Sequence, residues 1–156
     1  MTLTHHYERI RHRAVDRLRT FIELGGKLGS VVIVGLIKGL VPDSDDQSTY
    51  KCHPMDAVAT CLPMAERYGA TLVLEAVNRY GSDSLNTIRE FVGFIERIGS
   101  ERLKVHIDTF HMNIEESRIG ESIVAAGRNI GHVHVADSDR CFPSSGHYNF
   151  AEHGPS

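Results

Sequence analysis

The feature that most constrains the fold is a regular alternation between short apolar runs and longer segments with helical spacing. The apolar runs are rich in β-branched residues, which is typical of strands that are buried on both faces. They cover residues Val31–Leu36, Thr71–Leu74, Leu103–Ile107 and Ile130–Val135. Strands that are separated by helices need crossover connections, so we expect a parallel sheet and an α/β fold.

Apolar residues recur at helical spacing around these strands. The predicted helices cover residues His5–Glu23, Met55–Tyr68 and Leu85–Ile98, with a shorter helix within Ile114–Ala126. We expect the glycine pair Gly25-Gly26 to end the first helix, and Pro63 to kink or break the second. The polar segment Pro42–Ser48 is predicted to be a loop.

Composition narrows the class of protein. A length of 156 residues with 41% hydrophobic content suits one domain with a sizeable core. The formal net charge of −3 argues against a nucleic-acid partner. No apolar run is long enough to span a membrane, and three cysteines without CxxC spacing favour a reduced, cytoplasmic chain. We expect a single domain over residues 1–156, in which residues 138–156 form an irregular tail.

Polar side chains stand at the ends of three successive predicted strands. Glu75 follows Thr71–Leu74, Asp108 follows Leu103–Ile107, and His134 lies near the end of the last strand. The carboxyl ends of parallel strands meet at one edge, where α/β folds place their active sites. Two carboxylates and an imidazole favour Mn²⁺, Mg²⁺ or Co²⁺ over a structural zinc. Each residue alone is more simply explained as a helix cap or a core histidine, but their shared position predicts a divalent-metal site.

Three stretches of the sequence resemble one protein family. They are LEAVNRY (residues 74–80), HIDTFHMNIEE (residues 106–116) and GHVHVADSDR (residues 131–140). Together they resemble the xylose-isomerase-like sugar isomerase/epimerase family, and within it the ketose 3-epimerases of the tagatose/psicose type. The likeness runs over most of the chain, and the IDTFHMNIEE stretch is its most specific part.

The resemblance implies a set of roles. In that family the residues at the positions of Glu75, Asp108 and His134 bind a divalent metal, with Mn²⁺ first and Co²⁺ or Mg²⁺ as the other candidates. The residues at the positions of His111 and Arg140 contact oxygens of a small ketose or a related sugar. The implied reaction is proton transfer next to a carbonyl through a metal-stabilised enediolate, with Glu75 as the catalytic carboxylate.

The sequence also departs from the family pattern. The family fold is an eight-stranded TIM barrel of ~250 residues, whereas this chain has room for about four strands, which match the third to the sixth. A second catalytic glutamate is absent, and no strand precedes Glu152 that would let it serve instead. Gly81 stands where many relatives carry a glutamate that contacts substrate. We therefore expect a partial barrel that forms a homo-oligomer or pairs with the missing remainder, because its outer strands expose unpaired backbone groups.

Three interpretations of function stay open on the sequence alone. The first is a divalent-metal-dependent sugar isomerase or epimerase, or an inactive fragment of one. The second is a non-catalytic, truncated family member that binds a metal, a sugar or a partner protein. The third is an endonuclease-IV-like phosphodiesterase, which shares the barrel and a DTxH motif, but the net charge of −3 speaks against it. We favour the first, while the enzymatic status of the chain stays undecided.

Overall fold

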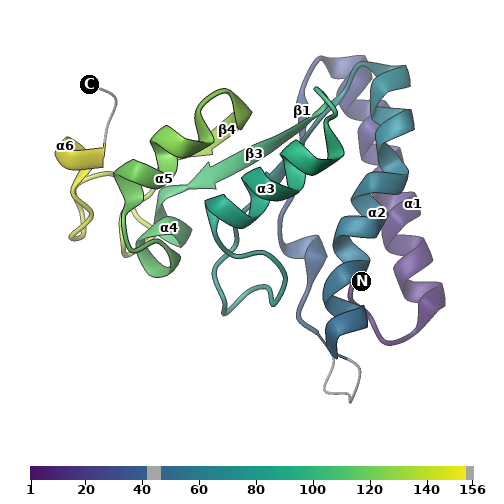
Figure 1. Ribbon diagram of the computed structural model, residues 1–156, viewed down its shortest axis with the longest axis horizontal. Helices are drawn as coiled ribbons and strands as arrows, with labels where there is room; N and C mark the ends of the chain where they lie inside the picture. The colour runs from purple at the N-terminus through teal and green to yellow at the C-terminus, as the bar shows by residue number, and fades with distance from the viewer. Residues whose placement is uncertain (42–46, 154–156) are drawn as a thin grey trace.

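The computed structural model describes residues 1–41 and 47–153, and it contains one parallel sheet flanked by helices (Figure 1). The strands are β1 (Val31–Val34), β2 (Thr71–Glu75), β3 (Leu103–Asp108) and β4 (Ile130–His134). They lie in the order β1-β2-β3-β4, and each strand is parallel to its neighbour. The prediction of four parallel strands is confirmed.

Helices connect the strands as a βα alternation requires. They are α1 (Glu8–Leu28), α2 (Gln47–Tyr68), α3 (Ile88–Ile98), α4 (Thr109–Glu115), α5 (Ile119–Ala126) and α6 (Phe150–His153), with the short 3-10 turns η1 (Leu36–Lys38) and η2 (Gly127–Asn129). Figure 1 shows α1 and α2 side by side near β1, and α5 and α6 at the opposite end of the molecule. None of the helices within the described ranges has both the length and the apolar character needed to cross a bilayer.

The core forms where the helices cover the sheet. Side chains from β2 and β3, such as Leu72, Leu74 and Val105, are fully buried and share one cluster with Ile22 of α1 and Phe91 of α3. Burial of apolar side chains is the main favourable contribution to folding. The cluster therefore fixes β2 and β3, and with them the side chains at their carboxyl ends.

The predicted end of the first helix at Gly25-Gly26 was wrong, because α1 continues to Leu28 and is capped by Gly29 with φ +64°. A Cβ atom on Gly26 would overlap the backbone oxygen of Tyr68, at the end of α2. The glycine thus permits close packing of α1 on α2 rather than ending the helix.

The second helix also differs from its prediction. Residues 42–46 of the predicted loop lie outside the described residues, and α2 begins at Gln47 instead of Met55. It continues through Pro54 and is not broken at Pro63. Each proline removes one backbone hydrogen bond, but the buried side chains of this helix hold it against the core.

The segment after β3 forms two helices where one was predicted. Helix α4 starts at Thr109, before the predicted region, and it ends at Glu115, because the backbone of Glu116 is extended. Helix α5 then covers Ile119–Ala126. The side chain of Asp108 accepts a hydrogen bond from the Phe110 N–H and so begins α4 directly at the end of the strand. Beyond β4 the described tail consists mainly of turns, with α6 as its one short helix.

Candidate active site

The three predicted metal ligands end three neighbouring strands. Glu75 is the last residue of β2, Asp108 of β3 and His134 of β4. Each offers a ligand atom, and these atoms lie within 4.8 Å of one another. The structure therefore brings together the three residues that the sequence placed at one sheet edge, in a donor set that suits a hard divalent cation.

Asp108 uses its two carboxylate oxygens differently. Its Oδ1 accepts a hydrogen bond of 2.9 Å from the Phe110 N–H at the start of α4. Its Oδ2 lies 3.9 Å from Nδ1 of His134. The plain explanation of Asp108 as a helix cap is thus compatible with a role as ligand, because each role needs one oxygen.

Glu75 lies in a confined position. A Cβ atom on Gly35, just after β1, would overlap Oε2 of Glu75, so the glycine leaves room for the carboxylate. Burial raises the pKa of Glu75, and the nearby charge of Asp108 raises it further. A carboxylate with a raised pKa accepts a proton more readily than a solvated one, which is the property required of a general base.

His111 lies beside Glu75 with a defined orientation. Its Nδ1 accepts a hydrogen bond of 3.3 Å from the backbone N–H of Asn78, so the neutral ring carries its proton on Nε2. That Nε2 lies 3.7 Å from Oε1 of Glu75. Burial lowers the pKa of His111 and favours this neutral form.

The residues between these groups hold the motifs against one another. The Thr109 hydroxyl donates to the backbone oxygen of Ala136 at 2.6 Å and accepts from its N–H at 2.9 Å, which joins the start of α4 to the segment just after β4. Arg79 forms a bidentate pair with Glu115 at 2.9 and 2.8 Å. The NRY and IDTFHMNIEE motifs are therefore linked by their own charged residues.

Arg140 reaches the site from the loop after β4. Its guanidinium carbon lies 4.5 Å from the ring centroid of Phe110, and its backbone is left-handed with φ +62°. Asp137 holds this loop by accepting hydrogen bonds from the N–H groups of Ser144 and Tyr148 at 2.9 and 3.0 Å. Although burial raises the pKa of Asp137, these backbone donors keep it well below its ordinary value.

A cavity of about 470 Å³ opens beside these groups. Glu75, His111 and Arg140 line it together with the aromatic rings of Tyr80 and Phe110. It thus presents a carboxylate, an imidazole and a guanidinium to one space, which is suited to a small polyhydroxy carbonyl compound.

Gly81 also lines the cavity, at the position where relatives were expected to carry a glutamate. A Cβ atom there would lie 2.7 Å from a methyl carbon of Val77, which leaves no room for a side chain without rearrangement.

Several residues of this region were not among the predicted site residues. Asn78 orients His111, and Phe110 lies under Arg140. His106 and His132 lie two residues before Asp108 and His134 in their strands. That spacing of two residues places them on the same face of the sheet as the proposed ligands, and it is the sequence signal from which they could have been found.

Comparison with known proteins agrees with this geometry. The family model described as "Xylose isomerase-like TIM barrel" matches residues 1–153. An L-ribulose 3-epimerase of Mesorhizobium japonicum is 37% identical over 142 residues, which cover 89% of this chain and 48% of the relative. A D-psicose 3-epimerase of Agrobacterium fabrum is 41% identical over 90 residues, which cover 58% of this chain and 31% of the relative.

Solved structures give the same picture. A structure of an L-ribulose 3-epimerase superposes with a TM-score of 0.83 at 35% identity, over 97% of this chain and 52% of that one. A D-psicose 3-epimerase determined with D-fructose has a TM-score of 0.82 at 27% identity, over 98% of this chain and 54% of that one. The chain therefore spans about half the length of such proteins, as a partial barrel would. On this evidence the chain belongs to the xylose isomerase-like TIM barrel family, and its relatives are ketose 3-epimerases.

Proposed function

We propose that this chain carries the metal-binding and proton-accepting edge of a ketose 3-epimerase that acts on small ketoses of the psicose or ribulose kind. The observation that supports this most strongly is the convergence of Glu75, Asp108 and His134 within 4.8 Å at one sheet edge. Two of the relatives are named as an L-ribulose 3-epimerase and a D-psicose 3-epimerase.

The proposed metal is Mn²⁺, held by the two carboxylates and the imidazole. This set of two oxygen donors and one nitrogen donor suits Mn²⁺ better than it suits a metal ion that prefers thiolate ligands. A divalent ion held there supplies positive charge that stabilises the negative charge developing on the sugar's carbonyl oxygen.

The side chains of this chain perform the remaining steps in the proposal. Glu75 removes the proton from the carbon next to the carbonyl, because it is the carboxylate that lines the cavity. The Nε2–H of His111 and the guanidinium of Arg140 donate hydrogen bonds to sugar oxygens, since both line the same cavity. Epimerisation also needs a second acid that returns a proton to the opposite face of the sugar. We assign this acid to the remainder of the barrel or to a partner copy.

We also infer that the chain works in the reducing cytoplasm. The support for this inference is that Cys52, Cys61 and Cys141 are all free thiols.

The test of the proposed function uses hydrogen exchange, because exchange needs a base on only one face of the sugar. The full chain is incubated with Mn²⁺ and either D-psicose or L-ribulose in D₂O, and NMR follows the loss of the proton at C3. We expect exchange with the wild-type chain and a decrease of at least about a hundredfold in Glu75→Gln.

The matched control is Glu96→Gln, which changes an exposed carboxylate on α3. It should exchange at the wild-type rate. If Mn²⁺ binds and no exchange occurs, the proposed activity is wrong and the non-catalytic interpretation replaces it.

A further inference from the structure

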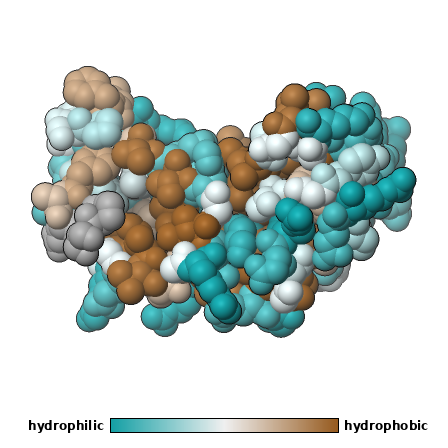
Figure 2. Space-filling model, turned by 90° about the horizontal axis from the view of Figure 1, so that it is seen from above, coloured by the Kyte–Doolittle hydropathy of each residue, from teal (hydrophilic) through white to brown (hydrophobic). Residues whose placement is uncertain are grey.

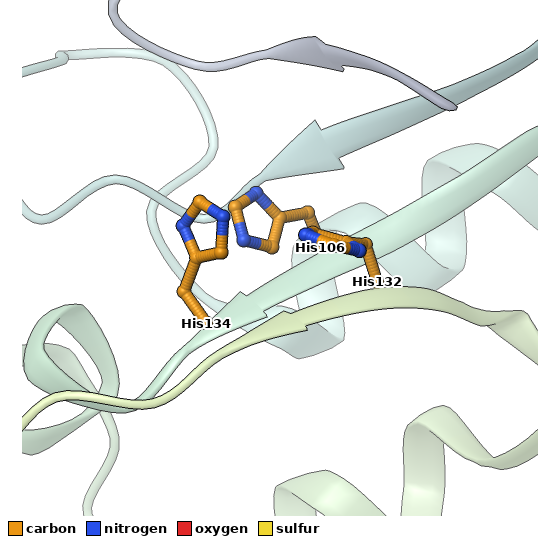
Figure 3. A group of neighbouring side chains, drawn as sticks. All are labelled: His106, His132 and His134. Carbon is orange, nitrogen blue, oxygen red and sulfur yellow. The ribbon is translucent and has the colours of Figure 1, made fainter. Parts of the chain in front are cut away.

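A second group of side chains with metal-binding potential lies next to the first. His106 of β3 and His132 and His134 of β4 each offer a ring nitrogen, and these atoms lie within 4.8 Å of one another. Figure 3 shows the three imidazole rings gathered on the same side of the sheet. The centroid of the His106 ring lies 5.1 Å from that of His132 and 4.1 Å from that of His134.

His106 is the residue that demands an explanation. Its side chain is fully buried, and neither Nδ1 nor Nε2 has a hydrogen-bond partner within the described part of the chain. Buried polar atoms are nearly always paired, because each orphan costs about 1–3 kcal/mol. Two orphaned nitrogens on one ring, aimed among two further imidazoles, therefore point to a missing ligand.

The donor set differs in chemistry from that of the neighbouring site. Three imidazole nitrogens without a carboxylate suit borderline ions such as Zn²⁺, Co²⁺ or Ni²⁺, whereas the Glu75, Asp108 and His134 set is rich in oxygen. Three protein ligands are also the number found in catalytic zinc sites, which leave the fourth position to water or substrate.

We propose that His106, His132 and His134 form a second, all-nitrogen site for a borderline divalent metal such as Zn²⁺. His106 and His132 lie two residues before Asp108 and His134 in their strands. The all-nitrogen site therefore lies beside the oxygen-rich site, and the two sites share His134. It requires neither a sugar nor the epimerase activity proposed above.

The test is a titration of the full chain with Zn²⁺ by calorimetry, and with Co²⁺ followed by visible absorption. His132→Gln is the main variant, because His132 is partly exposed and its replacement leaves the core intact. We expect this variant to bind Zn²⁺ at least about tenfold more weakly and to lose the visible Co²⁺ band. His106→Gln should have the same effect if circular dichroism shows that it folds.

Two controls separate this site from its neighbour and from the protein surface. The double variant Glu75→Gln/Asp108→Asn should keep its Zn²⁺ affinity, because it retains all three histidines. His12→Gln, on the exposed face of α1, should also leave Zn²⁺ binding unchanged. The proposal is overturned if Zn²⁺ affinity survives His132→Gln, or if the double variant abolishes it. Neither result would touch the Mn²⁺ site, which is tested separately.

Discussion

At the residue scale, Asp108 combines a structural contact with a chemical one. Its Oδ1 caps α4 at the Phe110 N–H, while its Oδ2 faces His134. An asparagine keeps an acceptor for the cap but loses the negative charge, whereas an alanine loses both. The two substitutions therefore separate the contributions of Asp108 to stability and to metal binding.

We predict that Asp108→Asn weakens Mn²⁺ binding by at least about tenfold, while its free energy of unfolding without metal stays within about 0.5 kcal/mol of the wild type. Asp108→Ala should lose the metal equally and also about 1 kcal/mol of stability, because the α4 cap is removed. Calorimetric titration and urea unfolding measure the two quantities. Wild-type Mn²⁺ affinity in Asp108→Asn would contradict the ligand assignment.

Lys38 is a buried cation close to the site. Its Nζ donates to the backbone oxygens of Glu75, Ser84 and Leu85 at 2.9, 3.2 and 3.1 Å, and it lies 4.5 Å from the ring centroid of Phe91. It therefore ties the end of β2 to the loop that follows. No pattern in the sequence distinguishes it from a surface lysine, because its burial arises from tertiary contacts with the end of β2, the loop after it and the Phe91 ring of α3.

The buried amine should make stability depend on pH. Burial lowers the pKa of Lys38 to about 7, against an ordinary value of 10.5. Between these two values the unfolded chain binds more protons than the folded chain, so the free energy of unfolding should rise with pH over this window.

Lys38→Met should abolish the pH-dependent rise. It should also lower stability by about 2–3 kcal/mol at pH 7, because buried carbonyls lose their donor. Urea unfolding at several pH values measures both effects, with the exposed Lys51→Met as control. An equal pH slope in wild type and Lys38→Met would refute the prediction.

Sequence reasoning placed Glu75, Asp108 and His134 correctly at one edge because strand ends follow from periodicity alone. It did not assign His106 or His132. A histidine two residues before a proposed ligand in an apolar strand looks the same in the sequence whether it packs, binds a metal or does both. The register shift between β3 and β4 near His106 is also invisible in the sequence.

At the element scale, two glycines within helices differ in the space around their Cα atoms. A Cβ atom on Gly26 of α1 would overlap the backbone of Tyr68, whereas one on Gly93 of α3 would meet nothing within 4 Å. We predict that Gly26→Ala destabilises the chain by about 1–3 kcal/mol through overpacking. Gly93→Ala should stabilise it by about 0.5–1 kcal/mol, because alanine loses less backbone entropy in a helix.

Thermal and urea unfolding of the two alanine variants provide the measurement. A stabilising Gly26→Ala would mean that α1 and α2 pack less closely than described.

The helix boundaries show the limits of local signals. Glycines and prolines predicted an end at Gly25-Gly26 and a kink or a break at Pro63, but α1 continues to Leu28 and α2 is not broken at Pro63. Tertiary packing decided each case, since the glycine pair allows close approach and the buried face of α2 outweighs one missing hydrogen bond. The start of α4 could have been predicted from the sequence, because an aspartate is a common N-cap residue and Asp108 directly follows a predicted strand.

At the scale of the whole molecule, the sheet is open at both edges. Among the described residues, β1 pairs only with β2, and β4 pairs only with β3. Exposed apolar side chains lie on these edge strands, including Ile33 and Val133 at 39% and 46% exposure. Figure 2 shows that apolar side chains also gather in a broad patch on one face. Such edges favour pairing with another strand.

We predict that the chain self-associates, so that light scattering after size-exclusion chromatography gives a mass above the 17.4 kDa of one chain. Val133→Lys should reduce association, because a charge on an edge strand opposes pairing. Val124→Lys, on the exposed surface of α5, should not. A cooperative monomer in the wild type would contradict this prediction.

The central proposal is that three strand ends of this chain form a site for one divalent metal ion. The most direct test is a titration of the full chain with Mn²⁺, followed by electron paramagnetic resonance of the free ion. We predict one Mn²⁺ per chain, with binding at least about tenfold weaker in Glu75→Gln and unchanged in Glu96→Gln. Equal Mn²⁺ affinity in all three proteins would contradict the claim.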